Sequence, residues 1–411
     1  MALNVLLSGL GVLIKLLCGL ITNKVLSVQL GPAAFGVWGN VFSLSTLYSA
    51  FSNGGIGQGL VARLSKPEQA DISRQRWLAG GLAFALAVPI MIAAFHAAFR
   101  QADVVTGSRA LTPLLVLILA LCAAISLHIQ SATLANNGAG TNSFVVAVGG
   151  MLSLAAYFLL VRPGSVESAA RALVVGATLI LLLWLIAARA TRVPWMPNGG
   201  LRQADWHTIR ELVPYVGIAL APALVGTAAI LAVRATVAAE AGAAAAGLWQ
   251  GMFRLSDAVI ALAQAVVAYV LLPAVFRAES PRRALKGRFR AYALLIGAGY
   301  AFGALILWFA SAHVVRLLYS DQYDAIAGLL WIELMGDALK ALAMPLVTFF
   351  IYERRLRLSW GLELLFSCSF LIGCQVLIRH MGLAGAAWAY VAANFALLMV
   401  ASAVFLGNRD A

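Results

Sequence analysis

The chain has 411 residues, of which 62% are apolar and 11% are charged, and its formal net charge is +13. Soluble globular proteins carry roughly 25% charged residues and about 45–50% apolar ones, so this composition excludes a soluble enzyme, a disordered regulator and a disulfide scaffold. The basic excess does not indicate a nucleic-acid partner, because the basic residues gather in alternate loops, as topogenic charges do. We therefore expect an all-α polytopic membrane protein.

Apolar runs long enough to cross a bilayer follow one another along the whole chain. A helical span needs about 20 apolar residues, and the sequence predicts twelve such helices. The first six are expected at residues 4–30, 36–64, 77–99, 110–134, 143–162 and 169–190. The other six are expected at 208–238, 243–276, 289–311, 323–352, 358–379 and 383–406.

A polar segment rich in Pro and Gly separates the two sets of helices. We expect an N-lobe at 1–190, a cytoplasmic linker at 191–207 and a C-lobe at 208–411. If both termini are cytoplasmic, 18 Lys and Arg residues fall in cytoplasmic loops and 6 in the opposite loops. Such a bias places the loops at 65–76, 191–207 and 277–288, together with both termini, in the cytoplasm.

An internal repeat relates the two predicted lobes. The ten residues from Gly36 align without gaps on the ten from Gly247, with five identities, and Gly31 aligns on Gly242 at the same offset of 211. Both copies begin helices that run from outside to inside, so the repeat is parallel and predicts a pseudo-two-fold relation between the lobes. Transporters with such halves bind their substrate between them. The alternative is two membrane helices that share a Gly/aromatic start by chance.

Five cations lie within the predicted spans: Lys15, Lys24, Arg234, Arg254 and Lys340. A charge at the bilayer centre costs roughly 2.5–3.5 kcal/mol on insertion scales, so such residues normally mark a functional site. Lys24 and Arg234 lie near the outer helix ends, from which a long side chain can reach water. A surplus of buried cations favours an anionic substrate, and phosphate is the commonest anionic group of substrates.

The membrane carboxylates are fewer than the cations. Asp257 and Asp337 are the deepest, and Glu333 and Glu363 come next. Arg254 and Asp257, like Asp337 and Lys340, are three residues apart and share a helix face. These pairs are either self-neutralising structural pairs or functional groups, and the sequence leaves both readings open.

Signatures of catalysis are absent from the sequence. The chain has no P-loop, its histidines form no metal motif, and no loop is long enough to carry catalytic groups of a glycan polymerase or ligase. We therefore expect no catalytic residue, no metal and no cofactor, and a transporter rather than an enzyme.

Four segments carry a resemblance to a known family. They read VLIKLLCGLITNKVLSVQLGPAAFGVWGN, NGGIGQGLVARLSK, GLWQGMFRLSDA with YVLLPAVFR, and LMGDALKALA. In this order they resemble the Wzx group of polysaccharide flippases, within the multidrug/oligosaccharidyl-lipid/polysaccharide exporter superfamily. The likeness runs over nearly the whole chain and is strongest to the flippases of enterobacterial common antigen lipid III.

The resemblance implies a substrate and a mechanism. It implies that an undecaprenyl-diphosphate-linked oligosaccharide, either an O-antigen unit or lipid III, moves from the inner to the outer leaflet of the bacterial inner membrane by alternating access. It also implies inner-membrane lipids, a glycan polymerase and a chain-length regulator as partners. The alternatives are a cation-coupled multidrug exporter of the same superfamily and a membrane glycan polymerase or ligase.

The family's charged membrane positions carry over to seven residues of this chain: Lys15, Lys24, Arg234, Asp257, Asp337, Lys340 and Glu363. The resemblance makes the cations substrate-binding residues and makes Asp257, Asp337 and Glu363 the titratable candidates for coupling to an ion gradient. Arg254 departs from the family pattern, which has a small polar residue there, so we expect it to mark substrate preference.

Overall fold

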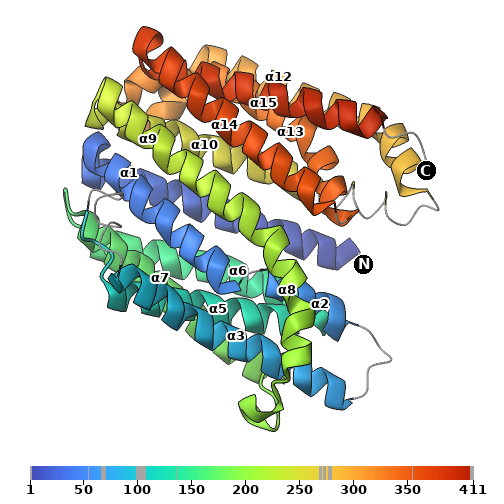
Figure 1. Cartoon of the computed structure of the whole chain (residues 1–411). Coiled ribbons are helices and arrows are strands. Elements are labelled where there is room, and N and C mark those ends of the chain that lie inside the picture. The colour runs from blue at the N-terminus through green and yellow to red at the C-terminus, as the bar shows by residue number, and fades with distance from the viewer. Residues whose placement is uncertain are drawn as a thin grey trace. The chain divides into compact units, whose positions relative to one another are not determined.

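The computed structural model describes residues 2–407 except for 54, 66–70, 99–107, 137, 268–270, 272–274, 276–279 and 354. All regular elements of these described residues are helices, and ten of the helices are long and apolar enough to cross a membrane (Figure 1). The expected all-helical polytopic membrane protein is thus confirmed, whereas the count of twelve spans stays a prediction. Parts of the loops at 65–76 and 277–288, and the end of the predicted span 243–276, lie outside the described residues.

By its internal contacts the chain divides into two compact units. The first comprises Met1–Leu30 and Val37–Thr227, and the second comprises Gly31–Gly36 and Ala228–Ala411. The boundary between the units therefore falls inside the predicted seventh span. The division into lobes at a cytoplasmic linker stays a prediction.

The described residues of the first unit form seven α-helices and two short helical segments: α1 (Ala2–Asn53, of which Gly31–Gly36 belong to the second unit), α2 (Ile56–Leu64), α3 (Asp71–Ala98), α5 (Pro113–Ala135), α6 (Ala139–Leu160), α7 (Val166–Ala190), η1 (Gly200–Gln203), α8 (Trp206–Ala221) and η2 (Pro222–Gly226). One core cluster joins α2, α3, α5 and α8 through residues such as Leu60, Trp77 and Leu212. A second joins α5, α6 and α7 around Trp184. Burial of these large apolar side chains holds the unit together, at about 1.5–3 kcal/mol for each fully buried one.

The first two predicted spans differ from the observed helices in their boundaries. α1 covers both, but Gly31 breaks its helical path with φ 68° and ψ 169°, and Pro32 follows. This is the boundary that the sequence predicted between the spans. The predicted helix 36–64 is itself interrupted, because α1 ends at Asn53 and α2 begins at Ile56 after Gly55 at φ 74°. Positive φ is readily adopted only by glycine, so these residues fix where the helices break.

Among its described residues, the second unit contains six α-helices and one 3₁₀ helix: α9 (Thr227–Ala241), α10 (Ala243–Val266), α12 (Pro281–Leu318), η4 (Asp321–Ile326), α13 (Leu330–Tyr352), α14 (Leu356–Met381) and α15 (Leu383–Gly407). α13, α14 and α15 lie side by side (Figure 1). The predicted helix 323–352 begins only at Leu330, because the residues before it form η4 and bury Tyr323 and Ile326. The predicted helix 208–238 is observed as α8, η2 and α9.

The aligned glycines of the repeat share one backbone conformation. Gly31 has φ 68° and ψ 169°, and Gly242 has φ 94° and ψ 162°. The helix starts that follow them cross closely within the second unit: a Cβ on Gly36 would lie 2.9 Å from the backbone nitrogen of Gly247, and a Cβ on Gly247 would overlap the Pro32 carbonyl oxygen. Gly31 and Gly242 are therefore required by their backbone conformation, and Gly36 and Gly247 by the close approach of the two helices.

Candidate functional site

The eight candidate residues fall into both structural units. Six lie on four helices of the second unit: Arg234 on α9, Arg254 and Asp257 on α10, Asp337 and Lys340 on α13, and Glu363 on α14. Lys15 and Lys24 lie on α1 in the first unit. The distances and contacts among the six candidates of the second unit are therefore described together, and the two lysines of the first unit are described separately.

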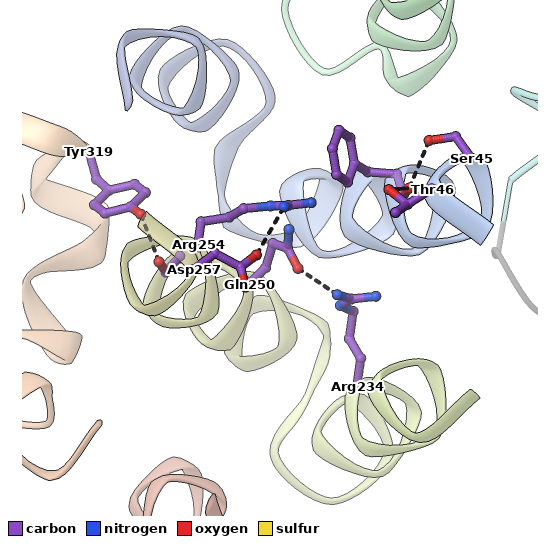
Figure 2. A network of polar contacts seen from close by, with 9 residues as sticks. Ser45, Thr46, Arg234, Gln250, Arg254, Asp257 and Tyr319 are labelled. Atoms are coloured by element: carbon purple, nitrogen blue, oxygen red, sulfur yellow. Dashed lines mark hydrogen bonds and ion pairs between the residues drawn. The ribbon is translucent and has the colours of Figure 1, made fainter. Parts of the chain in front are cut away.

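Arg234 is enclosed by its own unit. Its side chain is 1% exposed, and its Nη2 donates a hydrogen bond of 2.6 Å to Oε1 of Gln250 (Figure 2). Its guanidinium carbon lies 5.3 Å from the ring centre of Trp249. The chain reversal at Gly242 packs α9 against α10 and so brings these groups together. The expectation that Arg234 reaches water from a helix end is wrong, because an amide and an aromatic ring stabilise the buried cation instead.

Arg254 and Asp257 form the ion pair that their spacing predicted. The Nη1 of Arg254 lies 3.2 Å from Oδ2 of Asp257, one turn further along α10 (Figure 2). The Arg254 side chain is 14% exposed and that of Asp257 is 43% exposed. A partly open ion pair is only weakly stabilising, so both groups are able to exchange this contact for one to a ligand.

Asp337 does not pair with Lys340, although the two are three residues apart. Its carboxylate, 1% exposed, accepts hydrogen bonds from the Ser256 hydroxyl on α10 and, at 3.0 Å, from the Tyr390 hydroxyl on α15. Within the described residues, no ion-pair distance of 4.0 Å or less joins Asp337 to Lys340. The shared helix face therefore does not bring the two groups into direct contact, because tertiary partners satisfy the carboxylate.

The ammonium group of Lys340 lies over aromatic rings. Its Nζ is 6.0 Å from the ring centre of Phe366 and 5.8 Å from that of Tyr390. Glu363, which is half-buried, precedes Phe366 by three residues on α14 and therefore shares its helix face. The face of α14 that carries Glu363 is thus the one that packs towards Lys340.

The two lysines of the first unit have different surroundings. Lys15 is exposed, and its Cα lies 3.5 Å from the position that a Cβ on Gly150 of α6 would take. Lys24 is half-buried, and its carbonyl oxygen accepts a hydrogen bond of 3.0 Å from Ser27. Close packing of α1 on α6 therefore fixes the backbone at Lys15 and leaves its side chain free to extend.

The N-terminal half of α10 is held by two tyrosines that follow α12. The Tyr319 hydroxyl donates a hydrogen bond of 2.7 Å to the carbonyl oxygen of Gly251 (Figure 2). The Tyr323 ring also lies against Gly251. Phe35 meets Tyr323 edge to face at 6.0 Å between ring centres. These contacts fix α10 at the turn that carries Arg254.

The arrangement separates groups that a ligand can reach from groups that are closed off. Arg254, Asp257, Lys340 and Glu363 keep part of their surface accessible, whereas Arg234 and Asp337 are fully buried with their own partners. The accessible set can bind an anion through two cations and can exchange a proton through two carboxylates. The hydrogen bonds of the two buried residues connect neighbouring helices: those of Arg234 join α9 to α10, and those of Asp337 join α13 to α10 and α15.

Sequence reasoning missed the neutral partners in this network. Gln250, Ser256 and Tyr390 are buried and hydrogen-bond to charged groups. Ser256 was visible as a matched position of the repeat, but nothing in the sequence marks Gln250 or Tyr390. Glu333 was noted among the carboxylates without a role, and its spacing of four from Asp337 places both on one face of α13.

Comparison with known proteins gives a consistent set of similarities. The sequence profile of a family described as "Polysaccharide biosynthesis protein" matches residues 25–328. The lipid III flippase of Escherichia coli (strain K12) is 24% identical over 407 residues, which cover 96% of this chain and 95% of that protein.

Two solved structures share the fold. An inward-facing multidrug resistance MATE family transporter of the MOP superfamily superposes with a TM-score of 0.79 at 14% identity, covering 97% of this chain and 94% of its own. The lipid II flippase MurJ, in an inward closed conformation, gives a TM-score of 0.70 at 11% identity, with 98% of this chain and 87% of its own covered.

Proposed function

Because the chain belongs to the family of polysaccharide biosynthesis proteins, we propose that it is a flippase for an undecaprenyl-diphosphate-linked oligosaccharide. The substrate is an O-antigen unit or lipid III, moved from the inner to the outer leaflet of the bacterial inner membrane. The observation that carries this proposal is the alignment with a lipid III flippase over 96% of the chain. That relative is named as a flippase, which is a transporter and not an enzyme.

The charge balance of the spans supports a diphosphate substrate. A diphosphate that enters a bilayer loses hydration, and the loss is offset only by cations placed along its path. Arg254 and Lys340 keep accessible surface in the second unit, and Lys15 keeps it in the first. Guanidinium binds phosphate in bidentate fashion, and ammonium binds it as a point charge, so the two residue types suit the two phosphates of one substrate.

The proposed architecture has twelve spans in two six-helix lobes, at 1–190 and 208–411, joined by a cytoplasmic linker at 191–207. The shared backbone conformation of Gly31 and Gly242 supports the parallel repeat. The bias of 18 to 6 basic residues supports cytoplasmic termini. Alternating access then arises from rocking of one lobe against the other, with Asp257, Asp337 and Glu363 as the candidates for coupling to an ion gradient.

The proposed partners follow from the reaction. The isoprenoid chain of the substrate stays in contact with inner-membrane lipids, and a glycan polymerase with its chain-length regulator consumes the product on the far side. No part of the proposed mechanism requires a cofactor or a metal.

Reconstitution in liposomes tests the proposal directly. The assay measures transfer of a fluorescent undecaprenyl-diphosphate-linked oligosaccharide between leaflets, with the same glycan on undecaprenyl monophosphate as the matched substrate. We expect transfer of the diphosphate that exceeds transfer of the monophosphate. Arg254→Gln should reduce it about tenfold, since a hydrogen bond to a charged group contributes about 1.5–3 kcal/mol.

Arg316→Gln is the matched control. Arg316 pairs with Asp324 at 2.7 Å on the exposed surface at the end of α12, so its loss should leave transfer unchanged. Absence of glycolipid transfer by the wild-type protein, or equal loss in both variants, would refute the proposal. Transport of cationic drugs in its place would identify a multidrug exporter.

A further inference from the structure

A polar pocket lies between α9 and α14 in the second unit, close to the C-terminal ends of both helices. Its volume is about 560 Å³. Its lining includes Ala239 and Glu240 of α9, and Gln375, Val376, Arg379 and His380 of α14. None of the proposed substrate-binding or coupling residues lines this pocket, so it is a site separate from the proposed glycolipid path.

The two helices pack closely beside the pocket. Val237 of α9 belongs to the same core cluster as Cys374 and Ile378 of α14, and all three side chains are buried. Packed protein interiors resist deformation. The walls of the pocket therefore keep their spacing, and the polar groups that line it are held at fixed positions.

One acidic and one basic side chain face each other in the pocket. Nε of Arg379 donates a hydrogen bond of 3.1 Å to Oε1 of Glu240, and these side chains are 66% and 36% exposed. An ion pair with this much exposure contributes little to stability. It is therefore able to open towards a ligand, with the carboxylate free to accept from a cation and the guanidinium free to bind a phosphate.

An apolar stripe leads away from the pocket along α14. Val376, which lines the pocket, is 54% exposed, and Ile372, one turn before it, is 60% exposed. Cys368 and Leu364 are also exposed and continue the stripe at the same spacing of four residues. At 1.5 Å per residue the stripe runs about 18 Å. A lipid chain covers a similar length, because one leaflet takes up half of a hydrocarbon core of about 30 Å.

The charges of the pocket select among possible occupants. A purely anionic headgroup would meet the Glu240 carboxylate and the C-terminal ends of two helices, which disfavour anions. A purely cationic ligand would leave Arg379 without an acidic partner. A zwitterion that combines a phosphate with a primary ammonium group satisfies both side chains, and the ammonium brings the N–H donors that a carboxylate accepts from.

We propose that this pocket binds an aminophospholipid of the phosphatidylethanolamine type, with its phosphate on Arg379, its ammonium group on Glu240 and one chain along Val376 and Ile372. The lipid is a bound ligand and not the transported substrate. The site does not depend on which substrate the protein moves.

Native mass spectrometry of the full chain in detergent tests the site by counting bound lipids during titration. Dioleoyl phosphatidylethanolamine is the probe. Dioleoyl phosphatidylcholine keeps the phosphate and the chains but has no N–H donor, and dioleoyl phosphatidylglycerol has no cation. We expect the first phosphatidylethanolamine to bind about tenfold more tightly than either of the others, a difference of about 1.4 kcal/mol.

Two charge variants separate the roles of the two side chains. Glu240→Gln should remove the preference for phosphatidylethanolamine over phosphatidylcholine, because both lipids then bind through phosphate alone. Arg379→Gln should weaken both lipids by a similar factor. The matched controls are Asp324→Asn and Arg316→Gln, because that ion pair has similar side-chain exposure, 37% and 59%, and does not line the pocket. Neither control should change lipid binding.

A third variant tests the pocket without changing its charge. Ala239→Phe places a large side chain into the pocket from α9 and should abolish the tight binding of phosphatidylethanolamine. Ala228→Phe is its control, because Ala228 is exposed on the same helix and does not line the pocket. Unchanged binding in Ala239→Phe would overturn the proposal.

Three further results would also overturn it. The first is equal binding of the three lipids to the wild-type protein. The second is an unchanged preference in Glu240→Gln, or an equal loss in Asp324→Asn. The third is competition by soluble glycerophosphoethanolamine at the same concentration as the lipid, which would identify a headgroup site that makes no use of the chains.

Discussion

Gln250→Leu tests whether Arg234 is held as a buried cation by its own unit. Gln250 is 0% exposed, and its Oε1 accepts the hydrogen bond of 2.6 Å from Nη2 of Arg234. Leucine keeps the approximate size of the side chain but offers no acceptor. The buried guanidinium then loses its amide partner, while its contact with the Trp249 ring remains.

The expected cost follows from the charge on the donor. A hydrogen bond to a charged group contributes about 1.5–3 kcal/mol, whereas a neutral one contributes about 0.5–1.5 kcal/mol. We therefore expect Gln250→Leu to destabilise the protein by about 2 kcal/mol. Replacement of both partners by apolar residues is nearly neutral, so Arg234→Met added to Gln250→Leu should restore most of the lost stability.

Thermal unfolding in nanodiscs measures the stability of each variant and so ranks them. Gln130→Leu is the matched control, since Gln130 donates a bond of 2.7 Å to the neutral Asn142 on a helix of the first unit; it should cost less than Gln250→Leu. Equal melting of the Gln250 variant and the wild type, or a double variant less stable than either single one, would refute the account of Arg234 as a buried, partnered cation.

Three further predictions concern coupling, packing and topology. Asp337→Asn should keep the protein folded, because an amide oxygen still accepts from both hydroxyl partners, but should abolish complementation of a flippase-null strain; full activity would remove Asp337 from the coupling candidates. Gly247→Ala should prevent stable accumulation in the membrane, because a methyl group would overlap the Pro32 carbonyl, whereas Gly297→Ala, with nothing within 4 Å, should accumulate normally. Single cysteines in the 191–207 loop should resist labelling from outside intact cells, and labelling there would overturn the proposed orientation.

The sequence by itself determined the class of the protein and which segments are helical, but not the interruptions within 36–64 and 208–238 or the late start of the helix predicted at 323–352. A bilayer requires every backbone polar group to be hydrogen-bonded within the protein, and an apolar run of about 20 residues meets this requirement as a helix. Breaks at Gly31 and Gly242 were visible as matched glycines, because only glycine readily adopts the positive φ observed at both. The Arg254–Asp257 pair was equally predictable, since both residues lie on one turn of one helix.

Only the tertiary structure decided which charges are paired with each other. Asp337 and Lys340 have the same spacing as Arg254 and Asp257, yet Asp337 accepts from Ser256 and Tyr390, which are 81 and 53 residues away. Local spacing defines which groups are able to meet, whereas packing of α10, α13 and α15 determines which neighbour is closest. The hydroxyl and aromatic partners are common in any membrane helix, so no local pattern identifies them before the helices are packed together.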